Sequence, residues 1–153
     1  MDINKRINVR VRLVVIHDKK VLVQYRKKSD FYHYIGGHLE YGETIKDACI
    51  RETREECGED VKFDFQKILY VRDFIKLDED EHSIELFILG NIDKTEKLEG
   101  MKDPQHPDGD VWLTWLDIDN LPDNLLPKTL SAKLLEDFNE GFSKEGEYIG
   151  EIE

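Results

Sequence analysis

The chain has no long hydrophobic run. Its longest purely apolar runs, such as residues 13–16 and 86–89, are four residues long, whereas a membrane-spanning helix needs about 20. No apolar stretch with a small-residue cleavage site follows residues 1–6, so the pattern of a secretory signal is missing. We therefore expect a cytoplasmic protein with no membrane partner.

Cysteine is also scarce, and the two cysteines present are not placed for a disulfide. Cys49 and Cys57 lie on one predicted helix, which separates them by about 12 Å along its axis at ~1.5 Å per residue. Disulfide-bonded residues have Cα atoms less than about 7 Å apart. We expect both to be reduced thiols in the core.

Basic residues are outnumbered by acidic ones. There are 22 Lys and Arg against 34 Asp and Glu, a net charge of −12, which disfavours electrostatic binding to long nucleic acid. The acidic excess lies after residue 62. A small anionic substrate can therefore still bind in the first part of the chain, where a metal and local cations offset the negative potential of the protein. The candidate cations are Arg10, Arg12, Arg26, Lys27 and Lys28, for which solvated strand faces and a polar turn are the alternative explanation.

The 153 residues are 39% apolar and 37% charged, which is typical of a globular domain. We expect one domain over residues 1–142 and an acidic, frayed tail over residues 143–153. The polar stretch 93–110 predicts a long loop, and loops of that length are usually functional or mobile. The expected strands are 7–16 and 21–25, paired as a hairpin, then 34–35, 38–41, 61–75 with a bend or interruption, 83–91 and 111–116.

Two helices are expected as well. Thr44 is the N-cap of the first and completes a capping box with Asp47, and Gly58 is placed to end this helix in a left-handed conformation. Pro127 opens the second helix. The buried faces are expected to hold Ile45, Ala48, Cys49, Ile50, Thr53 and Cys57 in the first helix, and Leu130, Leu134, Leu135, Phe138 and Phe142 in the second.

Three carboxylates share one side of the first helix. At 100° per residue, Glu52, Glu55 and Glu56 fall within an arc of about 100°. Each pair repels by roughly 3–4 kcal/mol at an effective dielectric near 20. A cation among them relieves this repulsion, and oxygen ligands favour Mg²⁺ first and Mn²⁺ second. A glycine turn at Gly36 and Gly37 would let backbone carbonyls approach the same ion.

A solvated helix surface is the alternative explanation for residues 51–56 alone. A longer pattern argues against it, because seven residues stand at fixed spacings: Gly37, Glu43, Arg51, Glu52, Glu55, Glu56 and Gly58. This pattern resembles the Nudix box of the Nudix hydrolases over residues 37–59. Thr53 and Glu59 depart from it, since the family has aliphatic residues there. We expect both to be packing positions, so the departures would concern local stability more than catalysis.

The resemblance implies an α/β (α+β) fold, a Nudix-type α/β/α sandwich with a central mixed β-sheet. It also implies hydrolysis of a nucleoside diphosphate linked to another group, by metal-activated water attacking phosphorus. Glu52, Glu55 and Glu56 would be metal ligands with the Gly36 carbonyl, and Glu52 would orient water. Arg51 would hold the carboxylates by ion pairing, Glu43 would brace the loop, and a homodimer is plausible.

The substrate is less well determined. Phe31, Tyr32 and Tyr34 are candidates for stacking a base, with core packing as the alternative. Proline or tyrosine markers of ADP-ribose and dinucleoside polyphosphate hydrolysis are missing after the box. A non-hydrolytic nucleotide-binding regulatory module is the alternative function. Asp108 and Asp110 are candidates for an acid outside the box, against loop solvation, and His33, His38, His82 and His106 receive no role.

Overall fold

The computed structural model describes residues 5–153. Residues 1–4, which belong to the expected domain and to the N-terminus searched for a secretory signal, lie outside the described residues. In this part of the chain no helix is long and apolar enough to cross a membrane. The helices are α1 (Ile45–Cys57) and α2 (Leu130–Asn139), with short 3₁₀ turns at Leu77–Glu79 and Ile118–Asn120.

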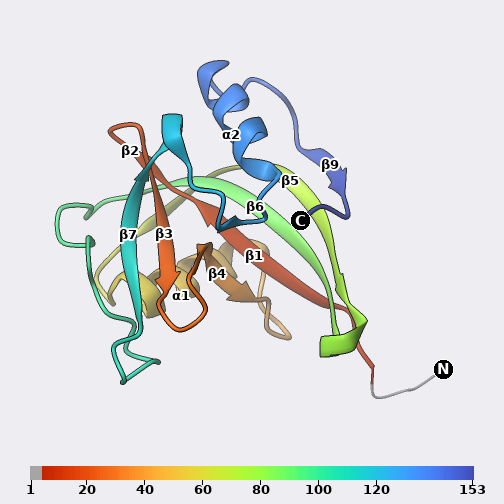
Figure 1. Cartoon of the computed structure of the whole chain (residues 1–153), viewed down its shortest axis with the longest axis horizontal. Coiled ribbons are helices and arrows are strands. Elements are labelled where there is room, and N and C mark those ends of the chain that lie inside the picture. The colour runs from red at the N-terminus through yellow and green to blue at the C-terminus, as the bar shows by residue number, and fades with distance from the viewer. Residues whose placement is uncertain (1–4) are drawn as a thin grey trace.

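Strands build one mixed sheet across the molecule (Figure 1). Its main order is β2-β3-β4-β1-β6-β5-β9, with β7 paired to β3 and β8 paired to β4. β1 runs parallel to β6 and antiparallel to β4. The strands are β1 (Asn8–Val14), β2 (Ile16–His17), β3 (Lys20–Arg26), β4 (Phe31–His38), β5 (Phe63–Lys76), β6 (Glu81–Ile92), β7 (Val111–Asp117), β8 (Leu125–Leu126) and β9 (Glu147–Gly150).

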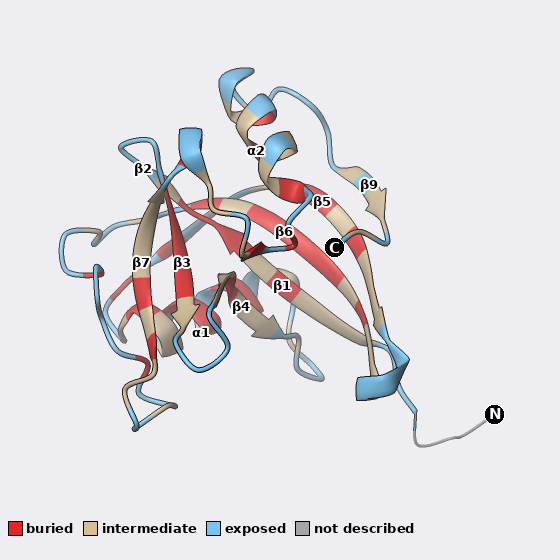
Figure 2. Cartoon of the chain, in the orientation of Figure 1, coloured by how far each residue is buried: buried red, intermediate tan, exposed pale blue. Residues whose placement is uncertain are grey.

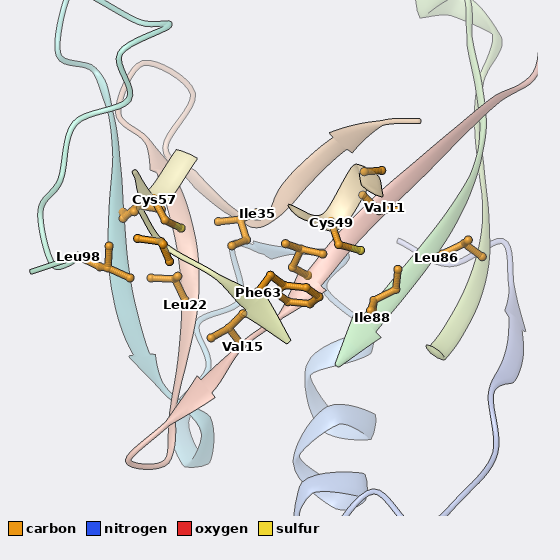
Figure 3. Close-up of a cluster of buried hydrophobic side chains, with 14 residues drawn as sticks. Val11, Val15, Leu22, Ile35, Cys49, Cys57, Phe63, Leu86, Ile88 and Leu98 are labelled. Carbon is orange, nitrogen blue, oxygen red and sulfur yellow. The ribbon is translucent and has the colours of Figure 1, made fainter. Parts of the chain in front are cut away.

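Each face of the sheet packs against one helix. Alternate side chains of a strand point to opposite faces, and Ile35 packs in one hydrophobic cluster while its neighbour Tyr34 packs in the other. The first cluster includes Cys49 of α1 (Figure 3) and the second includes Leu134 of α2. The buried residues run along the central strands in Figure 2. The expected sandwich with a central mixed sheet is therefore confirmed.

The glycine pair lies in a strand, and the expectation of a turn was wrong. Gly36 and Gly37 pair with Arg12 and Val11 of β1. Gly36 has φ +131°, and a Cβ there would lie 2.0 Å from the Val11 carbonyl oxygen. Glycine is needed at this position because the backbone of β1 approaches so closely. Of the short extended piece expected over residues 38–41, only His38 belongs to a strand.

Smaller corrections concern the two helices. Gly58 ends α1, but its φ of 127° and ψ of 146° are not those of the left-handed helical region. Ile50 is 36% exposed and so lies outside the buried face of α1. α2 begins at Leu130 rather than at Pro127 and ends at Asn139. Phe142 therefore lies beyond the helix, although it still packs against the same cluster as α2.

The C-terminal tail is not frayed. β9 pairs in parallel with β5, and the guanidinium of Arg72 donates to the carbonyl oxygen of Ile152 at 2.7 Å. Backbone groups of the tail make these contacts, so the acidic side chains from which fraying was expected do not decide its structure. Cys49 and Cys57 are buried free thiols, as expected, and burial raises the pKa of each to about 12.

Candidate functional site

A cleft of about 700 Å³ opens between α1 and the sheet. Its lining includes acidic residues of α1, a group of arginines from the strands, imidazoles, two half-buried phenylalanines, two glycines and the acids Glu85 and Asp103. The members used below are Glu52, Glu55, Glu56, Gly36, Gly37, Arg10, Arg12, Arg26, Arg72, Glu85, His33, His38, Phe31, Phe74, Asp103 and His106.

Helix α1 brings its carboxylates to this cleft from a capped first turn. The Asp47 amide donates to Thr44 Oγ1 at 3.1 Å, and the Thr44 amide donates to the Asp47 carboxylate at 3.1 Å. The expected capping box is thus confirmed. One residue before the helix end, Glu56 Oε2 accepts from the Gly36 amide at 2.8 Å, which ties α1 to β4.

Arg51 connects the loop before α1 to the carboxylates. Its guanidinium donates to both carboxylate oxygens of Glu43, at 2.8 and 2.9 Å. Its Nη1 lies 3.0 Å from Glu52 and 3.3 Å from Glu55, and its Nη2 donates to the His38 carbonyl oxygen at 2.9 Å. The hydrogen bond from Arg51 lowers the pKa of Glu43, and its counterpart from Glu43 raises the pKa of Arg51. These are the contacts that the resemblance implied for Arg51 and Glu43.

Burial works against the ionisation of two of the α1 carboxyl groups. Burial, and then the charge of Glu52, raises the pKa of Glu56 to about 8, against an opposing hydrogen bond from Gly36. Burial also raises the pKa of Glu52, against the positive charge of Arg51. A cation in the cleft would favour the ionised forms of both groups.

The acidic side chains do not form a ready coordination group. Within residues 5–153, no three His, Cys, Asp or Glu side chains come close enough together to hold a metal ion. Arg51 contacts both Glu52 and Glu55, and its charge relieves their repulsion. The donor set nevertheless fits a hard cation, because it consists of carboxylate oxygens. Gly37 leaves room beside them, since a Cβ there would lie 2.5 Å from Glu52 Oε1.

The Gly36 carbonyl, the fourth expected ligand, faces the arginine group. Arg12 Nη1 donates to it at 3.4 Å and to the Tyr34 carbonyl oxygen at 3.2 Å. Among the expected cations, Arg10, Arg12 and Arg26 line the cleft. Lys28 instead pairs with the two acids of the 93–110 loop, and Lys27 is exposed.

The two acids that were candidates outside the box do not face the carboxylates of α1. Asp108 and Asp110 pair with Lys28, at 2.7 and 3.3 Å, and neither lines the cleft in the described chain. Asp103, from the same loop, does line it and is 6% exposed. Its charge contributes to the raised pKa of Glu56. Sequence reasoning missed Asp103, for which the only signal was its place in a long loop.

Hydrogen bonds orient the Asp103 carboxylate. The Gln24 amide donates to Oδ2 at 3.3 Å and the Gln105 backbone amide donates to Oδ1 at 2.9 Å. His106 Nδ1 lies 3.2 Å from Oδ2, and its Nε2 lies 3.4 Å from Arg26 Nη1. Because arginine only donates, Nε2 accepts and Nδ1 carries the proton toward Asp103. His106 therefore links Arg26 to Asp103.

His33 has a similar position beside Arg26, although no role was assigned to it from the sequence. Arg26 Nε donates to His33 Nε2 at 2.9 Å, and His33 Nδ1 lies 2.9 Å from the Tyr34 carbonyl oxygen. Burial, together with the positive charge of Arg12, lowers the pKa of His33 to about 3. His33 is therefore a neutral hydrogen-bonding group in this site.

The aromatic candidates separate in the structure. Tyr34 is 1% exposed and packs edge-on against Phe87 in the core. Tyr32 packs against Tyr25 with ring centroids 4.7 Å apart. Phe31 and Tyr34 both line the cleft, and of these two only Phe31 is half-buried rather than buried. Phe74 is the second half-buried phenylalanine there.

Comparisons with known proteins agree with this geometry. The profile of the NUDIX domain matches residues 7–138. A MutT NUDIX hydrolase from Burkholderia pseudomallei is 22% identical with a TM-score of 0.65, over 86% of this chain and 97% of that one. A UDP-X diphosphatase is 19% identical with a TM-score of 0.67, over 93% and 67%. An ADP-ribose pyrophosphatase from Streptococcus suis is 17% identical with a TM-score of 0.64, over 94% and 99%. At these identities the similarity establishes the fold.

Proposed function

Because the chain belongs to the NUDIX domain family, we propose that it is a Mg²⁺-dependent hydrolase that cleaves a diphosphate linkage in a nucleoside diphosphate linked to another group. The observation that carries the proposal is the meeting of Glu52, Glu55 and Glu56 with Arg12 in one cleft. Clustered carboxylates suit a divalent cation, and arginine suits phosphate.

The carboxylates of α1, with the Gly36 carbonyl, would hold Mg²⁺ or Mn²⁺. When bound, the metal neutralises charge on the phosphate oxygens and lowers the pKa of bound water. Arg51 keeps Glu52 and Glu55 oriented toward the cleft, and Glu43 holds Arg51 from the preceding loop. Glu52, which lies beside Gly37, is the group proposed to orient water.

Asp103 is proposed as the acid outside the box, in place of Asp108 and Asp110. Its carboxylate is buried, faces the same cleft as Glu56, and is held by Gln24 and His106. A carboxylate held in this way can accept a proton from a water molecule positioned beside it. Its burial and its fixed orientation distinguish Asp103 from Asp108 and Asp110, which pair with Lys28.

The substrate class is proposed from the shape of the cleft and from the names of similar proteins. About 700 Å³ is a volume suited to a small-molecule ligand. Two of the structural neighbours are a UDP-X diphosphatase and an ADP-ribose pyrophosphatase. Nucleotide sugars and ADP-ribose are therefore the first substrates to test, and the half-buried rings of Phe31 and Phe74 are available to the nucleoside or the second group.

A non-hydrolytic nucleotide-binding regulatory module is the second candidate function. One observation favours it: Arg51 already pairs with Glu52 and Glu55, and no ready coordination group exists among residues 5–153. A module that only binds nucleotide needs the arginines but not a metal.

Turnover measurements separate the two functions. A panel of nucleoside triphosphates, nucleotide sugars, ADP-ribose and dinucleoside polyphosphates is assayed with Mg²⁺ and with EDTA. We expect Mg²⁺-dependent cleavage of one class, reduced by several orders of magnitude in Glu55→Gln and Glu56→Gln and unchanged in Glu59→Gln, an exposed residue after the helix. Unchanged turnover in the first two variants contradicts the proposal, and nucleotide binding without cleavage supports the regulatory module.

Location and assembly are further parts of the proposal. Two buried free thiols suit a reducing compartment, in agreement with the cytoplasm expected from the sequence. A homodimer, suggested by the resemblance alone, remains a prediction that light scattering at several protein concentrations can test.

A further inference from the structure

A group of three arginines on the sheet side of the cleft carries more positive charge than the two acids paired with it neutralise. Glu85 is 2% exposed and accepts from the guanidinium groups of Arg10, Arg12 and Arg72. Arg10 also pairs with Glu81 at 3.2 Å. These five side chains comprise three cations and two anions, so one positive charge is in excess. In a partly desolvated site, this excess attracts an anion.

Strand pairing holds this group in place. Arg10 and Arg72 lie on either side of Glu85, on β1 and β5 respectively. Arg12 is two residues further along β1, points to the same face, and reaches Glu85 through Nε at 3.1 Å. β1 and β6 are each paired on both edges, so the backbone beneath these side chains is fixed.

Of the three arginines, Arg12 is the one joined to the acidic end of the cleft. It donates to the Gly36 carbonyl oxygen, and the Gly36 amide donates to Glu56. Its Nε and Nη1 are occupied by Glu85 and by the Tyr34 and Gly36 carbonyls. Within residues 5–153, Nη2 has no hydrogen-bond acceptor, which leaves two N–H donors for a ligand.

We propose that Arg12 binds a non-bridging phosphoryl oxygen of the substrate through Nη2, and that Glu85 is the positioning residue of Arg12. This inference rests on the proposed function, because it assigns a phosphate contact within the same cleft. Arg10 and Arg72 balance the charges of Glu81 and Glu85, so the charge of Arg12 remains available to the ligand. A guanidinium that is already held on one side loses less conformational freedom when the phosphate binds.

Binding of inorganic pyrophosphate, measured by calorimetry with Mg²⁺ and with EDTA, tests the contact without turnover. We expect at least tenfold weaker binding to Arg12→Gln and an intermediate loss in Arg12→Lys, which keeps the charge. Arg54→Gln, which changes an exposed guanidinium of α1, serves as the control and should bind as the wild type does. Equal affinity of wild type and Arg12→Gln, or no binding by the wild type under either condition, overturns the proposal.

Two further measurements distinguish a contact from a structural role. Free guanidinium ion should restore several-fold binding to Arg12→Ala and leave Arg54→Gln unchanged. Glu85→Gln should show the same intermediate loss of pyrophosphate affinity as Arg12→Lys. Guanidinium should not restore its binding, because the guanidinium group of Arg12 is still present. Thermal unfolding of each variant verifies folding, and Arg12→Lys keeps the test valid if the neutral variants do not fold.

Failure of this inference and failure of the proposed function give different results. A wild type that binds pyrophosphate through Arg12 but cleaves nothing in the substrate panel contradicts the hydrolase and leaves the Arg12 contact standing. An active Arg12→Gln enzyme with unchanged KM and unchanged pyrophosphate affinity contradicts the Arg12 contact and leaves the hydrolase standing.

Discussion

Two arginines hold the three carboxylates of α1, one from the helix and one from the sheet. Arg51 contacts Glu52 and Glu55 from the helix, whereas Arg12 is joined to Glu56 through Gly36. The two guanidinium groups reduce the repulsion that three neighbouring carboxylates would otherwise cause. The same arrangement leaves Glu56 as the carboxyl group whose ionisation depends most on a bound cation.

The two neighbouring glycines should respond differently to alanine. In Gly37→Ala the new Cβ meets the flexible carboxylate of Glu52, which can move aside. We expect turnover to fall tenfold or more while the free energy of unfolding changes by about 1 kcal/mol or less. In Gly36→Ala the Cβ meets the Val11 backbone at a φ of +131°, and we expect destabilisation of about 3 kcal/mol or more. Urea denaturation and steady-state kinetics measure both, and full activity in Gly37→Ala would show that Glu52 tolerates displacement.

His33 should make stability fall in mild acid. Its pKa is about 3 in the folded protein and 6.5 ordinarily, so below pH 6.5 the unfolded chain binds a proton that the folded chain does not. This contribution to stability is complete above pH 6.5 and is lost as the pH falls toward 3. We expect a loss of about 1–2 kcal/mol between pH 7 and pH 5, and a smaller loss in His33→Gln. Urea denaturation at the two pH values measures it, and equal losses in both proteins would exclude His33 as the cause.

At the scale of elements, the site depends on how α1 meets β4. The helix begins at a capping box and ends one residue after Glu56, whose carboxylate accepts from the Gly36 amide of the strand. β4 in turn pairs with β1, and the two backbones approach closely at Gly36. The position of the carboxylates is therefore determined by both ends of the helix.

Removal of the cap should loosen the first turn of α1. Thr44→Ala loses the hydrogen bond from the Asp47 amide to Thr44 Oγ1, and we expect destabilisation of about 1 kcal/mol. Thr44→Ser keeps the hydroxyl and serves as the control, with a change within about 0.5 kcal/mol. Thermal unfolding with Asp47→Ala as a third variant checks the reciprocal bond, and equal stability of Thr44→Ala and wild type would mean that water replaces the cap.

For the whole molecule, the cleft lies where one helix, the central strands and the 93–110 loop meet. α1 supplies Glu56, the sheet supplies Arg12 and Glu85, and the loop supplies Asp103. A ligand that bridges these parts would stabilise the folded chain as a unit, because it binds only where they are assembled.

Mg²⁺ should therefore raise the unfolding temperature of the wild type. At a concentration of 100 times the dissociation constant, the expected stabilisation is about 2.7 kcal/mol, or roughly 5–10 °C for a chain of this size. Glu56→Gln should lose this shift and be as stable as the wild type, or more stable, without metal, because it buries no ionisable carboxyl group. A scan with Mg²⁺ and with EDTA measures the shift, and an equal shift in both proteins would place the metal elsewhere.

Local patterns made part of the fold and site predictable. The capping box, the buried face of α1 and the side carrying Glu52, Glu55 and Glu56 follow from helical periodicity within a few turns. The spacing of Gly37, Glu43 and Arg51 led to the family and through it to the sandwich. Asp108 and Asp110 were the candidates because they come just before a strand, but proximity in sequence does not show which way a loop folds back, and Asp103 is the acid of this loop that lines the cleft.

The sequence by itself determined the helix that carries the carboxylates, through the periodicity of that helix, and the family with its sheet sandwich, through the spacing of a few residues between 37 and 59. Only the tertiary structure decided that Gly36 lies in a strand, that Asp103 faces the cleft and that the tail adds β9. It also brought Glu85 to Arg12, 73 residues away in sequence. The physical reason is strand pairing, which joins distant segments through backbone hydrogen bonds that leave little trace in side-chain composition.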